Sequence, residues 1–143
     1  MAADQPLEDY ARITFAQGDH GSLDGKTVVD VKKNVEVDLK DNEPKVKAAE
    51  GYKFTGWDKE LKGKFTEDAT ITAQYRELKD VEVPDKPTDD KPSEAYAKIT
   101  FAQGDHGELI GDKNSVFVKK NVEVNLKDNA PEVKPADGYK FTG

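Results

Sequence analysis

Short alternations of apolar and polar residues divide the first half of the chain into predicted β-strands. In residues 12–16, Ile13 and Phe15 fall on one face, which is the pattern of a half-buried strand. No segment keeps a helical period for more than about three turns. The pattern therefore predicts a mainly β (α+β) module of about four strands. Further strands are predicted where alternating, β-favouring or aromatic residues gather, at residues 27–31, 35–39, 51–57 and 70–75. The segment 51–57 is predicted to be an aromatic-rich strand with a glycine irregularity.

Glycine-rich and polar residues interrupt the first predicted strand. Residues 17–21 read Gln-Gly-Asp-His-Gly, a composition typical of a turn. We expect Gly18 and Gly21 to adopt positive φ there, because glycine reaches that conformation without steric strain.

The segment 38–49 has two interpretations. Asp41 or Asn42 could cap a short helix with Pro44 in its first turn, as proline is favoured at that position. Alternatively the segment is an irregular crossover between strands. Its length and polarity leave both interpretations open.

A sheet of this size needs cover on its apolar face. Large side chains are scarce in the module, so its aromatic residues are predicted to supply both cover and core. The aromatic set is Phe15, Tyr52, Phe54, Trp57, Phe65 and Tyr75.

Much of the sequence occurs twice. Residues 10–25 match residues 96–111 at 13 of 16 positions, with an offset of 86. Residues 31–56 match residues 118–143 at 21 of 26 positions, with an offset of 87. The extra residue lies between these blocks, where an insertion is best tolerated in a loop or at the start of a strand.

The repeat and the composition between its copies predict the domain organisation. The segment between the copies holds three of the chain's seven prolines and few apolar residues, so it is predicted to be a semi-rigid spacer. The second copy ends at the GYKFTG motif, so we expect it to be marginally stable, disordered or strand-swapped. The predicted parts are an N-terminal tail (1–9), a complete module (10–78), a linker (79–95) and a truncated module (96–143).

Composition narrows the classes of function. The net charge of −7 disfavours nucleic-acid binding, which needs a positive patch. The sequence has no apolar run long enough to insert into a membrane, and its first residues do not read as a secretory signal. The absence of cysteine excludes disulfides, thiolate zinc sites and cysteine nucleophiles.

The two histidines invite a chemical interpretation, since His20 and His106 each follow an aspartate in a glycine-rich turn. A zinc site needs three or four protein ligands, yet each copy offers one histidine. A hydrolytic triad needs a nucleophile, and Ser22 of the first copy is replaced by Glu108 in the second. We therefore predict solvent-exposed turns, no metal or other cofactor, and no enzymatic activity.

Some aromatic residues have a second interpretation as a contact surface. Core packing is the first interpretation for Tyr52 and Trp57, but partial exposure of either would provide a platform for a glycan or a peptide. Together with His20 and His106, these residues are the candidate contact residues of the chain.

Two motifs in the complete module resemble a known family. They are Gly51, Tyr52, Phe54, Gly56 and Trp57, followed by Thr70, Ile71, Ala73 and Tyr75. The module resembles the internalin B-repeat, or Listeria–Bacteroides repeat, of Gram-positive cell-surface proteins. The resemblance implies a small β-grasp or ubiquitin-like fold, tandem arrangement, an extracellular location and attachment to the cell wall, and it implies no catalytic residues. Two features depart from the family: residues 38–50 are longer and more charged than its usual spacer, and the sequence has no LPxTG motif.

Two functions follow as hypotheses. In the first, the modules are a stalk or spacer of a bacterial surface adhesin, their partners are neighbouring modules, and they project a functional head from the cell wall. In the second, the modules bind a host extracellular protein or glycan directly, with avidity from repetition.

Overall fold

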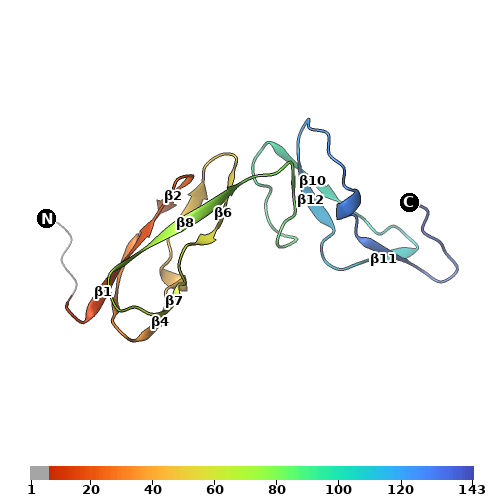
Figure 1. The fold of residues 1–143 in the computed structure, drawn as a ribbon. Coiled ribbons are helices and arrows are strands. Elements are labelled where there is room, and N and C mark those ends of the chain that lie inside the picture. Colours follow the sequence, from red (N-terminus) through yellow and green to blue (C-terminus); the bar gives the residue numbers. More distant parts are fainter. Residues whose placement is uncertain (1–6) are drawn as a thin grey trace. The chain divides into compact units, whose positions relative to one another are not determined.

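The computed structural model describes residues 7–143 and shows two compact units (Figure 1). Unit 1 is Met1–Glu77 and unit 2 is Leu78–Gly143. Of the predicted N-terminal tail, residues 1–6 lie outside the described residues.

Unit 1 is built on a four-stranded sheet in the order β3-β1-β8-β6. The central pair, β1 and β8, is parallel, and Ile13 lies opposite Ala69. Each central strand pairs antiparallel with its outer neighbour. The mainly β prediction is therefore confirmed. The bounds are β1 Tyr10–Ala16, β3 Val28–Lys32, β6 Tyr52–Trp57 and β8 Ala69–Glu77.

Two short ribbons complete unit 1. Strand β2 (Gly21–Asp24) pairs with β5 (Lys45–Ala48), and β4 (Glu36–Asp38) pairs with β7 (Lys62–Lys64). A 3-10 turn, η1 (Lys40–Asn42), connects β4 to β5.

The helix considered for residues 38–49 does not form, and the alternative of an irregular crossover is only partly correct, because residues 45–48 form the paired strand β5. Pro44 is buried and directly precedes β5 instead of opening a helix. The alternation Lys-Val-Lys-Ala after Pro44 suits a strand with one covered face. Val46 pairs with Leu23 of β2, so tertiary pairing decides the conformation of this polar segment.

The core of unit 1 lies on one face of β1 and β8. Ile13 and Ile71 are completely buried, and each such side chain contributes roughly 1.5–3 kcal/mol relative to an exposed one. The alternation predicted for β1 is confirmed, because its buried residues occupy every second position. The buried core consists of Ala11, Ile13, Phe15, Val31, Leu39 and Ile71.

A β-bulge shapes the aromatic strand β6. Phe54 lies opposite Tyr75, and Trp57 lies opposite Ala73. These two pairs are three positions apart on β6 but only two positions apart on β8, so Thr55 is an additional residue in β6. The bulge brings Phe54 and Trp57 to the same face, with ring centroids 5.3 Å apart. Gly56 permits it with a φ of +134°, which confirms the glycine irregularity predicted for this strand.

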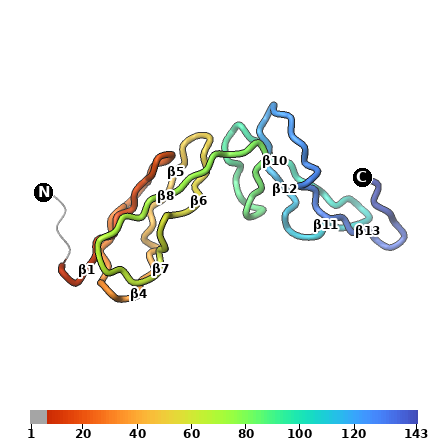
Figure 2. Tube along the Cα trace, viewed as in Figure 1, coloured from red at the N-terminus to blue at the C-terminus, as the bar shows by residue number. Residues whose placement is uncertain are grey.

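Unit 2 repeats two of the local pairings of unit 1. Figure 2 labels the strands β10, β11, β12 and β13 that form them. Strands β10 and β12 pair as β1 and β3 do, and β11 and β13 pair as β2 and β5 do. A short strand, β9, adds to the free edge of β12. The bounds are β9 Val81–Glu82, β10 Tyr96–Thr100, β11 Gly107–Ile110, β12 Ser115–Lys119, η2 Lys127–Asn129 and β13 Glu132–Pro135.

The start of the predicted linker belongs to the sheet of unit 2 rather than to an extended spacer. Glu82 lies opposite Phe117, and the amide of Lys119 donates to the carbonyl of Asp80 at 2.8 Å. The hydroxyl of Tyr96 donates to the carbonyl of Lys79 at 2.6 Å. Residues 79–82 are therefore anchored by main-chain hydrogen bonds that a composition-based prediction does not detect.

The repeats differ at the residue of β12 that lies opposite Glu82 of β9. In unit 1, Arg12 and Asp30 form a two-pronged ion pair across β1 and β3, and this hydrogen bonding lowers the pKa of Asp30. At the matching register of unit 2, Lys98 faces Phe117, which is only 3% exposed. A large apolar residue thus replaces a charged one, and covering it favours the docking of β9.

Replacing Val81 with proline tests the anchoring of β9. A proline there disturbs β9 and frees the amide of Lys119, because proline is poorly accommodated in a paired strand. We expect hydrogen exchange at Lys119 to accelerate while exchange in β1 and β8 is unchanged. Lys91→Pro is the control, since it adds proline to the same segment outside β9. Equal protection of Lys119 in all three chains would contradict the docking.

Candidate functional site

Six aromatic rings of unit 1 form one continuous series of contacts. The rings of Phe15 and Trp57 meet edge to face at 5.0 Å, and Phe54 lies between Trp57 and Tyr75. Edge-to-face contacts of this kind each add about 0.5–1.5 kcal/mol beyond the area they bury. The series continues through Tyr75 and His20 to Tyr52. Most of the predicted aromatic set is thus brought together along the sheet.

The prediction that His20 projects into solvent is wrong. Its ring stacks on Tyr52 with a centroid separation of 3.9 Å and an interplanar angle of 6°, and the residue is half-buried. The backbone explains the contact, because the amide of Ala49 donates to the carbonyl of His20 and the amide of Tyr52 to that of Ala49. These two hydrogen bonds hold the turn beside the start of β6.

The same stack recurs in unit 2. The rings of His106 and Tyr139 lie 3.9 Å apart at an angle of 7°, and the amide of Ala136 donates to the carbonyl of His106. His106 is exposed, whereas His20 is half-buried. The histidine of the duplicated turn therefore has a packing partner in both units, a role that the spacing of residues in sequence did not indicate.

Tyr75 locks the first turn of unit 1 against β8. Its hydroxyl donates to the carbonyl of Gln17 at 2.6 Å, and burial raises the pKa of its phenol. Positive φ is confirmed for Gly18, at +72°, but not for Gly21, which begins β2. Gly21 is needed for a different reason: a Cβ atom there would collide with the ring and hydroxyl of Tyr75.

Trp57 joins the core to an open groove. Its indole Nε1–H donates to Glu43 Oε1 at 2.8 Å, while its ring packs on Phe15 and Phe54. Most of the Trp57 side chain therefore packs in the core, which was the first interpretation, and one edge of the indole faces the groove. This groove has a volume of about 580 Å³ and is lined by Asp38, Lys40, Glu43 and residues 57–62.

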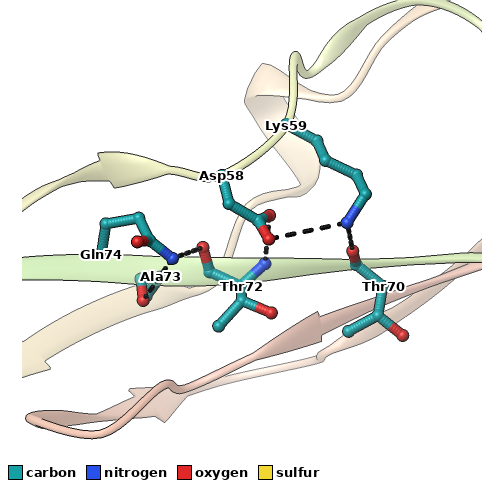
Figure 3. A network of polar contacts seen from close by, with 6 residues as sticks. All are labelled: Asp58, Lys59, Thr70, Thr72, Ala73 and Gln74. Carbon is teal, nitrogen blue, oxygen red and sulfur yellow. Dashed lines mark hydrogen bonds and ion pairs between the residues drawn. The ribbon is translucent and has the colours of Figure 1, made fainter.

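A polar strap continues from Trp57 along β8, on the side where β6 pairs and just beyond the end of β6 (Figure 3). The carboxylate of Asp58 accepts from the amide of Thr72 at 2.8 Å, and the amide of Asp58 donates back to the carbonyl of Thr72 at 2.9 Å. The ammonium group of Lys59 donates to the carbonyl of Thr70 at 2.6 Å. The strap covers backbone groups that would otherwise form an open sheet edge.

The site offers packing and hydrogen bonding rather than a set of converging reactive groups. In residues 7–143, no three His, Cys, Asp or Glu side chains gather where they could hold a metal ion. None of the helices in this part of the chain has the length and apolar character that crossing a membrane requires. The prediction of a non-enzymatic role remains a prediction.

Comparison with protein-family models, curated proteins and solved structures finds no match for this chain. The resemblance to internalin B-repeats therefore continues to rest on the motifs of β6 and β8.

Gly18 and its counterpart Gly104 form a matched pair for testing the lock by Tyr75. Both have φ near +73°, at +72° and +74°, so alanine costs both units a similar backbone strain of roughly 1–2 kcal/mol. A Cβ atom on Gly18 would also lie 2.5 Å from the carbonyl oxygen of Ala73, whereas nothing lies within 4 Å of one on Gly104.

We therefore expect Gly18→Ala to destabilise unit 1 by about 1–3 kcal/mol more than Gly104→Ala destabilises unit 2, which is the usual cost of overpacking. Native-state hydrogen exchange measures the opening free energy of each unit separately. Equal losses in the two units would show that Gly18 is not pressed against β8.

The raised pKa of Tyr75 predicts a loss of stability at high pH. Below about pH 10 the phenol is neutral in both the folded and the unfolded state. As the pH rises through the folded-state pKa, the unfolded chain has already released its proton, so the stabilising contribution disappears. Urea unfolding of unit 1 between pH 9 and pH 11.5 measures this loss. In Tyr75→Phe this component is absent, and an unchanged pH slope in that variant would contradict the assignment.

Proposed function

We propose that the chain is a stretch of tandem spacer modules from a bacterial cell-surface adhesin, extracellular and attached to the cell wall. The sheet order β3-β1-β8-β6 with a parallel central pair supports the β-grasp class that the resemblance implies. The duplication supports a spacer, because a stalk needs repeated length more than distinct sites.

The observation that carries the proposal is the direction of the first and last strands of unit 1. Because β1 and β8 are parallel neighbours, the chain enters at one end of the sheet and leaves at the other. Ile13 lies opposite Ala69, so Tyr10 and Glu77 are separated by eleven residue steps along the sheet. At about 3.3 Å per step, one module adds roughly 36 Å to the length of a stalk.

The same geometry suits a module that bears load. Pulling Tyr10 and Glu77 apart slides β8 along β1, so the evenly spaced hydrogen bonds of the parallel pair resist the force together. The strap on the other edge of β8 adds the bonds of Asp58 and Lys59. Unfolding such a sheet by its ends requires several bonds to break at once rather than one after another.

The anchored linker supports the same role. Strand β8 ends at Glu77, and hydrogen bonds to the body of unit 2 begin at the carbonyl of Lys79. Little of the predicted linker before Tyr96 therefore serves as a free tether between the last strand of one module and the sheet of the next.

Direct binding of a host protein or glycan is the second candidate, and the groove beside Trp57 favours it. The exposed edge of the indole and the charged rim of the groove could contact sugar hydroxyls or a peptide. Binding of isolated unit 1 to a glycan or matrix-protein array, lost in Trp57→Ala, would support this function over a passive spacer.

Small-angle X-ray scattering on arrays of residues 10–95 tests the spacer. We expect the maximum dimension to rise by a constant increment of roughly 36 Å or more for each added copy, since each copy contributes its sheet length. Arrays of one, two and four copies give the series. In a compact assembly, the radius of gyration would instead rise only as about the 0.38 power of chain length. That outcome would contradict the proposal.

A further inference from the structure

Residues 79–95, called the linker loop from here on, close on themselves at the surface of unit 2. Lys79 at the start of the loop is joined to Tyr96, the residue after its end, because the tyrosine hydroxyl donates to the lysine carbonyl at 2.6 Å. The amide of Lys119 donates to the carbonyl of Asp80, and β9 pairs with β12 directly afterwards. The segment that composition predicts to be an extended spacer is therefore folded back, with its two ends close together.

The middle of the linker loop is organised as well. The carboxylate of Asp89 accepts from the amides of Asp85 and Lys86 at 3.1 and 3.0 Å, a local side-chain-to-backbone arrangement that shapes a turn. The ammonium group of Lys98 in β10 donates to the carbonyl of Pro87 at 3.2 Å. The loop is thus attached to the hairpin of β10 and β12 at its start, in its middle and at its end.

The linker loop helps to bury a face of this hairpin that is open in unit 1. Phe117 and Ser115 alternate on β12 and share one face, where they are 3% and 6% exposed. Val28, the counterpart of Ser115, is 46% exposed in unit 1. Lys98, which contacts the loop, lies opposite Phe117 on the same face, and Pro84 of the loop is itself buried.

Strand β9 is a short anchor. It covers only Val81–Glu82, and Pro84 follows two positions later. Proline has no amide hydrogen to donate, so it cannot prolong the pairing with β12. Strand β10, in contrast, pairs with β12 over its whole length from Tyr96 to Thr100. Fewer main-chain bonds hold the loop than hold the hairpin, so the loop should detach at a lower force.

We propose that the linker loop is an extensible element, which stays closed on the hairpin at rest and detaches under tension while β10 and β12 remain paired. A pull on the chain at Glu77 meets the anchors at Lys79 and Asp80 before it reaches β10. Seventeen residue steps separate Lys79 from Tyr96. At about 3.1 Å per residue, the released proline-rich loop spans roughly 50 Å, so release lengthens the chain by roughly 40 Å.

The composition of the linker loop suits repeated opening and closing. Its three prolines cannot donate an amide hydrogen to another open sheet edge, so the released loop is poorly suited to pair elsewhere. Val83 is already 41% exposed when the loop is closed, so release exposes little additional surface from this side chain. The use of the extra length by an array rests on the proposed spacer function, whereas release itself is a property of unit 2.

Force spectroscopy on the chain of 143 residues tests the release. The sequence has no cysteine, so Glu77→Cys and Thr100→Cys provide two unique attachment points at exposed residues on either side of the loop. We expect one reversible lengthening of roughly 40 Å as the load rises. A loop that is already extended at the lowest load would overturn the proposal, and so would a single larger step that also pulls β10 away from β12.

Three variants in this background test the anchors. Phe117→Asp introduces the residue of the first repeat and should speed release at fixed load by about tenfold or more, because buried apolar contact is lost. Tyr96→Phe keeps the ring but removes the hydroxyl, and should speed release by roughly threefold to tenfold. Thr88→Ala, at an exposed position of the loop, is the matched control and should leave the rate unchanged.

Hydrogen exchange of the β10 amides checks that each variant keeps the hairpin. Equal release rates in the parent chain and all three variants would refute the assigned anchors. The spacer function and the extensible loop fail separately. Arrays that lengthen as a rod, in a protein without the reversible step, would retain the spacer and refute the loop. A reversible step in this chain together with compact arrays would do the reverse.

Discussion

The parallel pairing of β1 with β8 is the constraint on which the rest of unit 1 depends. It joins residues 56 positions apart, as the hydrogen bond from Arg12 to Asp68 shows, so a large loop-closure entropy must be overcome. The pairing places a strand on both sides of each central strand, and Ile13 and Ile71 become completely buried. The bulge in β6, the lock by Tyr75 and the strap from Asp58 all act on β8 once it is in place.

Unit 2 shows what the same residues do without that pairing. The β10–β12 hairpin, the β11–β13 ribbon and the stack of His106 on Tyr139 all form, because none of them includes a residue of a β8-like strand. Burial follows only in part, because Tyr96, Val116 and Phe117 are buried whereas other apolar residues are not. Leu39 is 2% exposed in unit 1, while its counterpart Leu126 is only half-buried.

Divergence between the repeats is as informative as their identity. Phe117 stands where unit 1 has Asp30, and it lies opposite Glu82, in the segment that composition alone assigned to a semi-rigid spacer. Three prolines and many charges make a linker prediction reasonable, yet the two-residue strand β9 pairs with Phe117 and Val118 of β12. The signal was present in the sequence as an apolar residue at a position that is polar in the other copy.

The sequence by itself determined the repeat, the mainly β class, the alternation of Ile13 and Phe15, and the glycine irregularity of β6, because these depend on local periodicity and backbone sterics. It did not reveal the strand after Pro44, the packing of His20 or the docking of β9. Those features depend on partners far away in sequence or on the other side of a turn. Only the tertiary structure decided them, since a short segment can form a strand, a turn or a linker, and packing against a neighbouring surface determines which of these it forms.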